Sequence, residues 1–160
     1  MNKLIIAAGA FVLASSPAYA EPMTAQQYVA AAGAGDLYER ESSKIVMGST
    51  EDPRIRDFAQ MMISNHTKST AEVKAATAAA RVKVAPARLK PEQAKMIAQL
   101  KAQQGKARDM TYLTQQKMAH QQALALHQDY ARNGTARPLR DAAAAITPVV
   151  EQHIAKLQAL

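Results

Sequence analysis

Mostly apolar residues recur every three or four positions in the segment from Asp57 to Val73 and just before it. This spacing places them in one stripe along a helix. The stripe consists of Ile55, Ala59, Met62, His66, Ser69 and Val73. Phe58 and Ile63 widen it, and this period is typical of an amphipathic helix with one face in a core. His66 lies within the stripe, so a titratable ring is expected to face the interior of the fold.

Capping signals give this helix and its predecessor their starting points. Thr24 followed by Gln27 is a capping-box signature, which predicts a helix from about residue 25 to the glycine at position 48. Asp52-Pro53 then predicts a second helix, because Asp caps free backbone N–H groups and proline fits the first helical position. This second helix contains the stripe and is expected to end near Ala80.

The C-terminal half predicts further helices. Pro91-Glu92 begins a short helix, and Gly105 is expected to break or kink the chain. Residues 106–132 carry a strong helical pattern, which Asn133-Gly134 is expected to end by a left-handed cap. A last helix follows Thr135, and Pro148 inside it should kink it or mark a new first turn.

The pattern as a whole indicates an all-α protein: four main helices, one extra short helix and no strand. Short connections between long helices favour antiparallel neighbours, so we predict an up-and-down four-helix bundle formed by residues 21–160 as one domain. A long coiled coil is the alternative, and the glycine and proline breaks argue against it.

The first twenty residues have the features of a signal peptide. Lys3 precedes an apolar run from Leu4 to Leu13, and Ala18-Tyr19-Ala20 fits a small-x-small cleavage pattern. The run is too short to span a bilayer, which needs about 20 apolar residues. We therefore expect residues 1–20 to be removed after Ala20 and the mature chain to be periplasmic or secreted, without a transmembrane segment.

Charge narrows the class of partner. The chain carries +7, and the first twenty residues hold one basic and no acidic residue, so the mature chain carries +6. Export argues against nucleic acid as the partner, and anionic envelope lipid or polymer is the better match. The most basic segment is the proline-interrupted linker 81–90, with Arg81, Lys83, Arg88 and Lys90. The sequence has no cysteine, so stability must come from packing and not from disulfides.

All four histidines, which are His66, His120, His127 and His153, lie on or beside apolar helical stripes. Neutral imidazole binds zinc, copper and iron, and ligands on facing helices can converge inside a bundle. Glu39 could add a carboxylate; Glu41 points about 160° away from it, so at most one of the two faces a shared centre. Each histidine also has a simpler interpretation as a hydrogen-bonded core residue, and His127 could extend to solvent at the end of the bundle.

Several segments resemble one bacterial family, domain of unknown function 4142. These segments are Tyr28-Val29-Ala30-Ala31, residues 35–44 (GDLYERESSK), residues 58–62 (FAQMM) before Asn65-His66, Asp109 with Tyr112, His120, and Pro148 before His153. The family is exported and described as ferritin-like, and some members are labelled outer-membrane proteins. The resemblance covers about Ala25 to Leu160. It implies a helical bundle and marks Glu39, His66, Asp109, His120 and His153 as positions where the family pattern also places such residues.

The chain departs from the family pattern at three places. The family usually has Asp-His where this chain has Asn65-His66, Phe where it has Arg108, and Leu-Pro where it has Thr147-Pro148. Loss of the Asp would remove one carboxylate that could orient a metal ligand.

Three functions remain open from the sequence. The first is a periplasmic binding or stress-protection protein without catalysis, because there is no complete catalytic motif, no Glu-x-x-His pair and no phosphate-binding loop. The second is a metal-binding or metal-oxidising bundle, in which His66, His120 and His153 would hold iron, zinc or copper, with Glu39 as a carboxylate and Asp109 as a supporting group. The third is an envelope interaction module that uses the linker 81–90.

Overall fold

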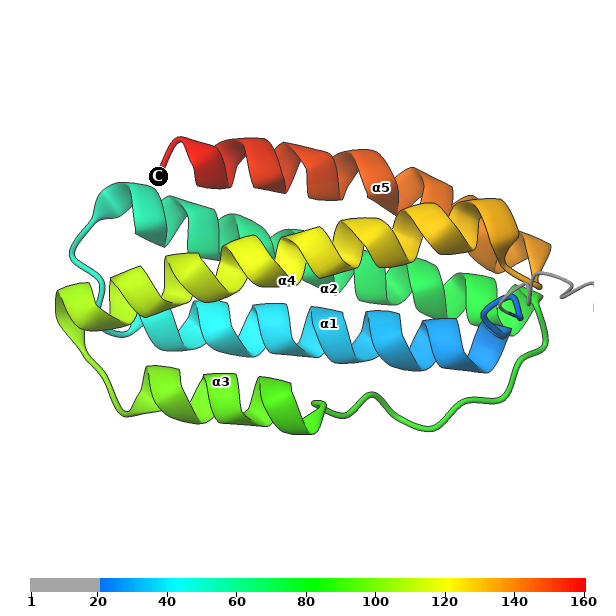
Figure 1. Ribbon diagram of the computed structural model, residues 1–160, viewed down its shortest axis with the longest axis horizontal. Helices are drawn as coiled ribbons and strands as arrows, with labels where there is room; N and C mark the ends of the chain where they lie inside the picture. The colour runs from blue at the N-terminus through cyan, green and yellow to red at the C-terminus, as the bar shows by residue number, and fades with distance from the viewer. Residues whose placement is uncertain (1–20) are drawn as a thin grey trace, which may run out of the picture.

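Five helices form the described part of the chain, residues 21–160, in a computed structural model (Figure 1). The helices are α1 (Ala25–Met47), α2 (Pro53–Ala79), α3 (Pro91–Lys101), α4 (Gly105–Asn133) and α5 (Arg137–Gln158). The predicted all-α class is confirmed, and no strand occurs within residues 21–160. The predicted signal peptide lies outside the described residues. No helix within residues 21–160 is long and apolar enough to cross a membrane.

The predicted caps explain why α1 and α2 begin where they do. The Thr24 hydroxyl accepts a hydrogen bond from the backbone N–H of Gln27, and the Gln27 side chain accepts one from the Thr24 N–H at 2.9 Å. The Asp52 carboxylate accepts from the Arg54 N–H at 2.9 Å, with Pro53 at the first helical position. These bonds satisfy backbone donors that have no partner inside the helix.

Two glycines set the ends of α4 in different ways. Gly105 has φ +53° and forms the predicted break between α3 and α4. The predicted left-handed cap at Gly134 is wrong, because Gly134 is extended, with φ −61° and ψ 151°. A Cβ at position 134 would lie 2.6 Å from the Tyr130 ring and from the Tyr130 carbonyl oxygen. Glycine is needed there for close approach and not for a positive φ.

Pro148 lies inside an unbroken α5, so it does not mark a new first turn. Proline removes one backbone hydrogen bond from a helix interior. Packing of Ile146 and Val150, which are buried on either side of Pro148, keeps this segment against the core.

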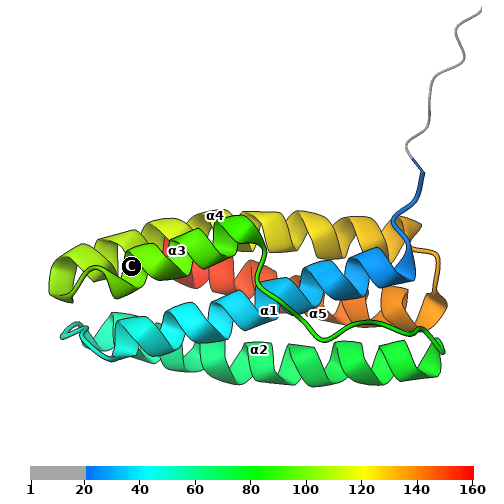
Figure 2. The same cartoon turned by 90° about the horizontal axis from the view of Figure 1, so that it is seen from below.

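The four long helices pack as a bundle, and α3 lies outside it (Figures 1 and 2). The most extensive packing joins α1 to α2 and α4 to α5, and the pairs α1–α4 and α2–α5 close the bundle. α3 packs against α1 and α4. The linker 81–90 runs in an extended form across α1 to reach α3, as Figure 2 shows.

The apolar core is divided into two clusters along the bundle. One cluster includes Tyr28, Val73, Tyr130 and Leu139. The other includes Val46, Phe58, Met62, Leu100, Tyr112 and Leu157. Each of the four long helices contributes to both clusters, and α4 gives one buried tyrosine to each. The positions between the two clusters are therefore the middle of the bundle, and they are polar.

Candidate metal centre

Three helices bring three histidines together in this middle layer. His66 comes from α2, His120 from α4 and His153 from α5. Each offers a ring nitrogen, and these three atoms all lie within 4.8 Å of one another. The exposed fractions of the three residues are 7%, 1% and 1%. The predicted ligands thus converge in the interior, away from bulk solvent.

The position of the cluster follows from helix periodicity. On α2, His66 lies one turn after the buried Met62 and two turns before the buried Val73. His153 lies on α5 between the buried Val150 and Leu157. The stripe that drives each helix into the core thus also carries the histidine inward, because residues three, four and seven apart share a face.

His66 is oriented by an aspartate from the neighbouring helix. Asp36 Oδ1 on α1 lies 2.8 Å from His66 Nδ1, and the Thr70 hydroxyl donates to Asp36 Oδ2 at 2.9 Å. His66 Nε2 is buried without a hydrogen-bond partner among the described residues. The ring therefore presents one unengaged nitrogen, which is the arrangement expected when a carboxylate fixes the outer nitrogen of a metal-binding histidine.

The other two rings also have a partner at the outer nitrogen. His120 Nδ1 lies 2.9 Å from the backbone carbonyl of Gln116, and His153 Nε2 lies 2.9 Å from the side-chain amide nitrogen of Asn65. Their inner nitrogens, His120 Nε2 and His153 Nδ1, are 3.3 Å apart. Two nitrogens bound to one zinc ion in tetrahedral geometry are separated by about 3.3 Å. At this distance His120 Nε2 and His153 Nδ1 can either share a hydrogen bond or bind one metal ion together.

Glu39 lies beside the cluster and not within it. Its Oε1 is 3.7 Å from His120 Nδ1, while Oε2 is buried without a hydrogen-bond partner among the described residues. Glu39 is 4% exposed, whereas Glu41 is only partly buried, so the prediction that at most one of them faces the interior agrees with the structure. A buried carboxylate without full hydrogen bonding is costly unless a positive charge lies close to it.

The protonation of the three rings is unequal. Burial acts to lower the pKa of His66, but the hydrogen bond to Asp36 and the charges of Glu39 and Asp36 outweigh it, so the net shift is upward. Burial lowers the pKa of His120 despite the opposing charge of Glu39. Burial, followed by charge repulsion from the protonated forms of His66 and His120 and from Lys156, lowers the pKa of His153 to about 3. His120 and His153 are therefore neutral at pH 7 and keep a lone pair for a metal ion.

The structure does not bring the other predicted residues into the cluster. Asp109 is buried and accepts a hydrogen bond from Thr50 at 3.0 Å, near the start of α4. It precedes His120 by eleven residues, which is about 16 Å along the helix. His127 is 5% exposed and does not extend to solvent; its Nδ1 lies 3.0 Å from the Tyr28 hydroxyl.

Sequence reasoning missed two contributors to the site. Asp36 shares the buried face of α1 with Ala32 and Glu39, and this spacing was a usable signal. Asn65, expected only to lack the family's carboxylate, contacts His153, while Asp36 supplies a carboxylate to His66. Arg108 is also used: its guanidinium donates to the carbonyls of Leu100, Gln103 and Ile45, and so ties the α3–α4 turn to α1.

Comparisons with known proteins agree with this architecture. A fragment of a DUF305 protein from Deinococcus radiodurans has a similar structure, with a TM-score of 0.72 at 15% identity; the match covers 88% of this chain and 97% of that one. A protein from Streptomyces coelicolor described as a secreted DUF305 protein has a TM-score of 0.67 at 14% identity, covering 84% and 90%. At these identities the likeness shows the fold alone.

Sequence comparison identifies the family directly. No curated protein matches the chain. The family model described as "Domain of unknown function (DUF4142)" matches residues 11–160, which confirms the resemblance seen in the sequence. The chain belongs to the DUF4142 family.

Proposed function

We propose that this protein is an exported helical-bundle protein that binds one transition-metal ion through His66, His120 and His153. The observation that carries the proposal is the approach of three buried ring nitrogens, from three different helices, to within 4.8 Å of one another. Export is supported by the leader-like sequence of residues 1–20 and by the fold shared with a DUF305 protein described as secreted.

A purely structural histidine core accounts less well for the same contacts. Buried polar atoms in native proteins are nearly always hydrogen-bonded. Here His66 Nε2 and Glu39 Oε2 both lack a partner among the described residues. A cation bound to the three rings would engage the first atom and would place a positive charge close to the second. One ion would thus satisfy both groups.

The donor set limits the metal to a small group. Three imidazole nitrogens, with a carboxylate close by, suit zinc, copper and iron, and they suit calcium and magnesium poorly. Three protein ligands leave a coordination position open, as in catalytic zinc sites. The described residues contain one such three-histidine group and no Glu-x-x-His pair, so the proposal is a single ion and not a di-iron centre. It requires binding and assigns no reaction.

The test is a metal titration of the mature chain purified without a polyhistidine tag. We expect one equivalent of Zn²⁺, Cu²⁺ or Fe²⁺ by calorimetry and by elemental analysis after desalting. His120→Gln and His153→Gln should lose this binding, whereas His127→Gln, which changes a buried histidine outside the cluster, should keep it. Circular dichroism checks that each variant is helical. A folded wild-type protein that binds none of the three metals stoichiometrically would overturn the proposal.

A second candidate function uses the basic linker as a contact surface for anionic lipid. Lys83, Arg88 and Lys90 line a groove of about 560 Å³ between the linker and the start of α1, and no acidic side chain lines it. Vesicles with anionic headgroups should bind the wild-type protein at low salt and release it as salt screens the charges. Replacing these three residues by Gln should weaken binding more than replacing Lys74, Lys95 and Lys101. Equal losses would contradict a role for the groove.

A further inference from the structure

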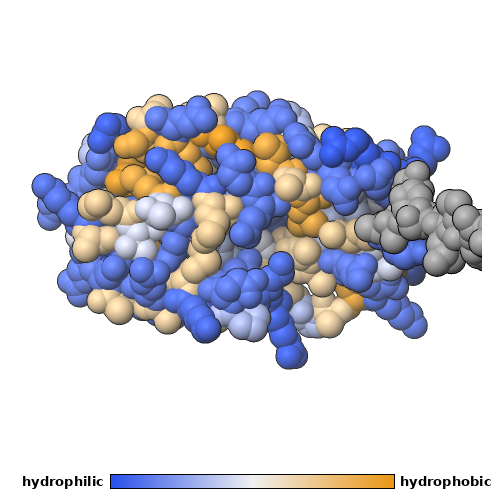
Figure 3. All heavy atoms as spheres, in the orientation of Figure 1, coloured by the Kyte–Doolittle hydropathy of each residue, from blue (hydrophilic) through white to orange (hydrophobic). Residues whose placement is uncertain are grey.

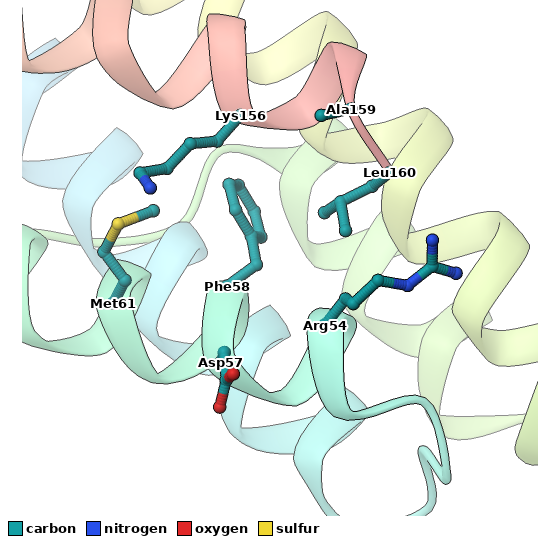
Figure 4. Close-up of a pocket in the computed structure, with 7 residues that line it drawn as sticks. All are labelled: Arg54, Asp57, Phe58, Met61, Lys156, Ala159 and Leu160. Atoms are coloured by element: carbon teal, nitrogen blue, oxygen red, sulfur yellow. The ribbon is translucent and has the colours of Figure 1, made fainter.

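A metal ion needs a path to the histidine cluster, because all three rings are buried. A cavity lies between the start of α2 and the end of α5 (Figure 4). It has a volume of about 300 Å³ and is lined by Phe58 and Met61 of α2 and by Lys156, Ala159 and Leu160 of the C-terminal end. In Figure 3, hydrophobic side chains gather on the surface toward this end of the molecule.

Phe58 contacts both the cavity and the cluster. Its ring lines the cavity, and in Figure 4 it stands upright between α2 and α5, with Lys156 and Met61 on one side and Leu160 on the other. The centroid of the same ring lies 6.3 Å from that of His120. His120 and His153 have ring centroids 5.3 Å apart. One aromatic side chain therefore lines the cavity and also lies beside a histidine of the cluster.

Three charged side chains line the cavity, and they are Arg54, Asp57 and Lys156. The Arg54 guanidinium is paired with Asp52 at 2.7 Å. Lys156 forms no ion pair within 4.0 Å among the described residues, and it follows His153 by three positions on α5. Asp57 also lines the cavity, and in Figure 4 its carboxylate points away from the Phe58 ring.

We propose that this cavity is the entrance through which a metal ion reaches the three histidines, with Phe58 as the gate and Lys156 as a charge that slows the passage of cations. This inference rests on the proposed metal binding and adds the route to it. A rotation of the Phe58 side chain opens the route without separating the helices. Such a gate changes the rates of uptake and release together and leaves the bound state, and hence the affinity, unchanged.

The first test narrows the entrance. Ala159 is exposed at the end of α5, so Ala159→Trp can fill the cavity without changing a buried side chain. Ala75→Trp, at an exposed position of α2 away from the cavity, is the matched control. Stopped-flow uptake of the bound metal and its release to excess chelator should both slow about fivefold or more in Ala159→Trp, with Kd unchanged within about twofold, because gating acts on both rates. The control should match the wild type.

The second test widens the entrance or removes its charge. Phe58→Leu, which keeps an apolar side chain in the core, should accelerate uptake and release by similar factors. Lys156→Gln should accelerate metal uptake, and the difference in uptake rate between this variant and the wild type should shrink as salt is raised. Lys74→Gln, on the exposed face of α2, is the control and should leave the uptake rate unchanged. Suppose that Ala159→Trp and Phe58→Leu both bind metal stoichiometrically and with the same rates as the controls. That result would overturn the proposed entrance but not the proposed metal binding. Absence of stoichiometric binding in the wild type would overturn the proposed function, and the entrance with it.

Discussion

Asp36 and His66, thirty residues apart in the sequence, meet across the α1–α2 interface with 2.8 Å between Oδ1 and Nδ1. The carboxylate fixes which ring nitrogen carries the proton and leaves Nε2 facing the cluster. Arg40 donates to the His66 carbonyl at 3.1 Å, and Thr70 donates to Asp36. The pair is thus held by α1 and α2 together, in the way that a carboxylate partner orients a metal-binding histidine.

Replacing this carboxylate should weaken metal binding. Asp36→Asn keeps the side-chain volume and removes the charge that raises the pKa of His66 and aligns its ring. We expect a loss of about 10- to 100-fold in metal affinity, measured by competition with a chromogenic chelator, because partners of this kind have effects of that size. Asp141→Asn, an exposed position on α5, is the control and should bind like the wild type. An unchanged affinity in Asp36→Asn would show that the pair has no role in binding.

Glu39 should affect metal affinity and apo stability in opposite directions. Glu39→Gln removes a buried charge with an unbonded oxygen, so the metal-free protein should become more stable by about 1 kcal/mol. The same change removes a negative charge close to the proposed cation, so metal affinity should fall. Urea denaturation of the apo protein and calorimetric titration measure the two effects. Glu41→Gln, on the partly buried face, should show neither, and equal behaviour of the two variants would contradict this role for Glu39.

Asp109 should matter for stability and not for the metal. It accepts from the buried Thr50 hydroxyl and connects the α1–α2 loop to the start of α4. Asp109→Ala leaves that hydroxyl without its partner, and we expect a loss of about 1–3 kcal/mol in the free energy of unfolding. Metal stoichiometry and affinity should be unchanged at temperatures where the variant is folded. If Asp109→Ala instead lost metal affinity while keeping the stability of the wild type, Asp109 would support the metal ligands, as the sequence led us to expect.

Acid should destabilise the protein partly through His127. Burial lowers its pKa to about 4, with the charge of Asp36 acting against this shift and that of His66 reinforcing it. Above pH 6.5 the ring is neutral in both states, so it adds no pH dependence. Between about pH 6.5 and 4 the unfolded state takes up a proton that the folded state does not, so stability falls with decreasing pH.

This loss is about 3 kcal/mol if His127 acts alone, from the size of the pKa shift. Urea denaturation at several values between about pH 7.5 and 4 measures it. His127→Gln cannot titrate but can still bond the Tyr28 hydroxyl, so its stability should fall less steeply over the same range. Parallel curves for the wild type and the variant would contradict the assignment.

The helices and their ends were readable from the sequence because they depend on local interactions. Thr24 with Gln27, Asp52 with Pro53, and Gly105 each act within a few residues, and each is observed where the sequence places it. The error at Gly134 has a tertiary cause. The Tyr130 ring that lies against it stacks on Tyr28 of α1, with centroids 4.0 Å apart, and no local rule contains that contact.

The candidate site also has some features that the sequence predicts and others that only the tertiary structure decides. Periodicity alone indicated that His66, His120 and His153 face inward, and that at most one of Glu39 and Glu41 could accompany them. The tertiary structure decided which of these residues share one level of the bundle, because the axial register between helices depends on how their side chains interlock. That register brings Asp36 to His66 and Asn65 to His153, and it leaves Asp109 with Thr50 and His127 with Tyr28.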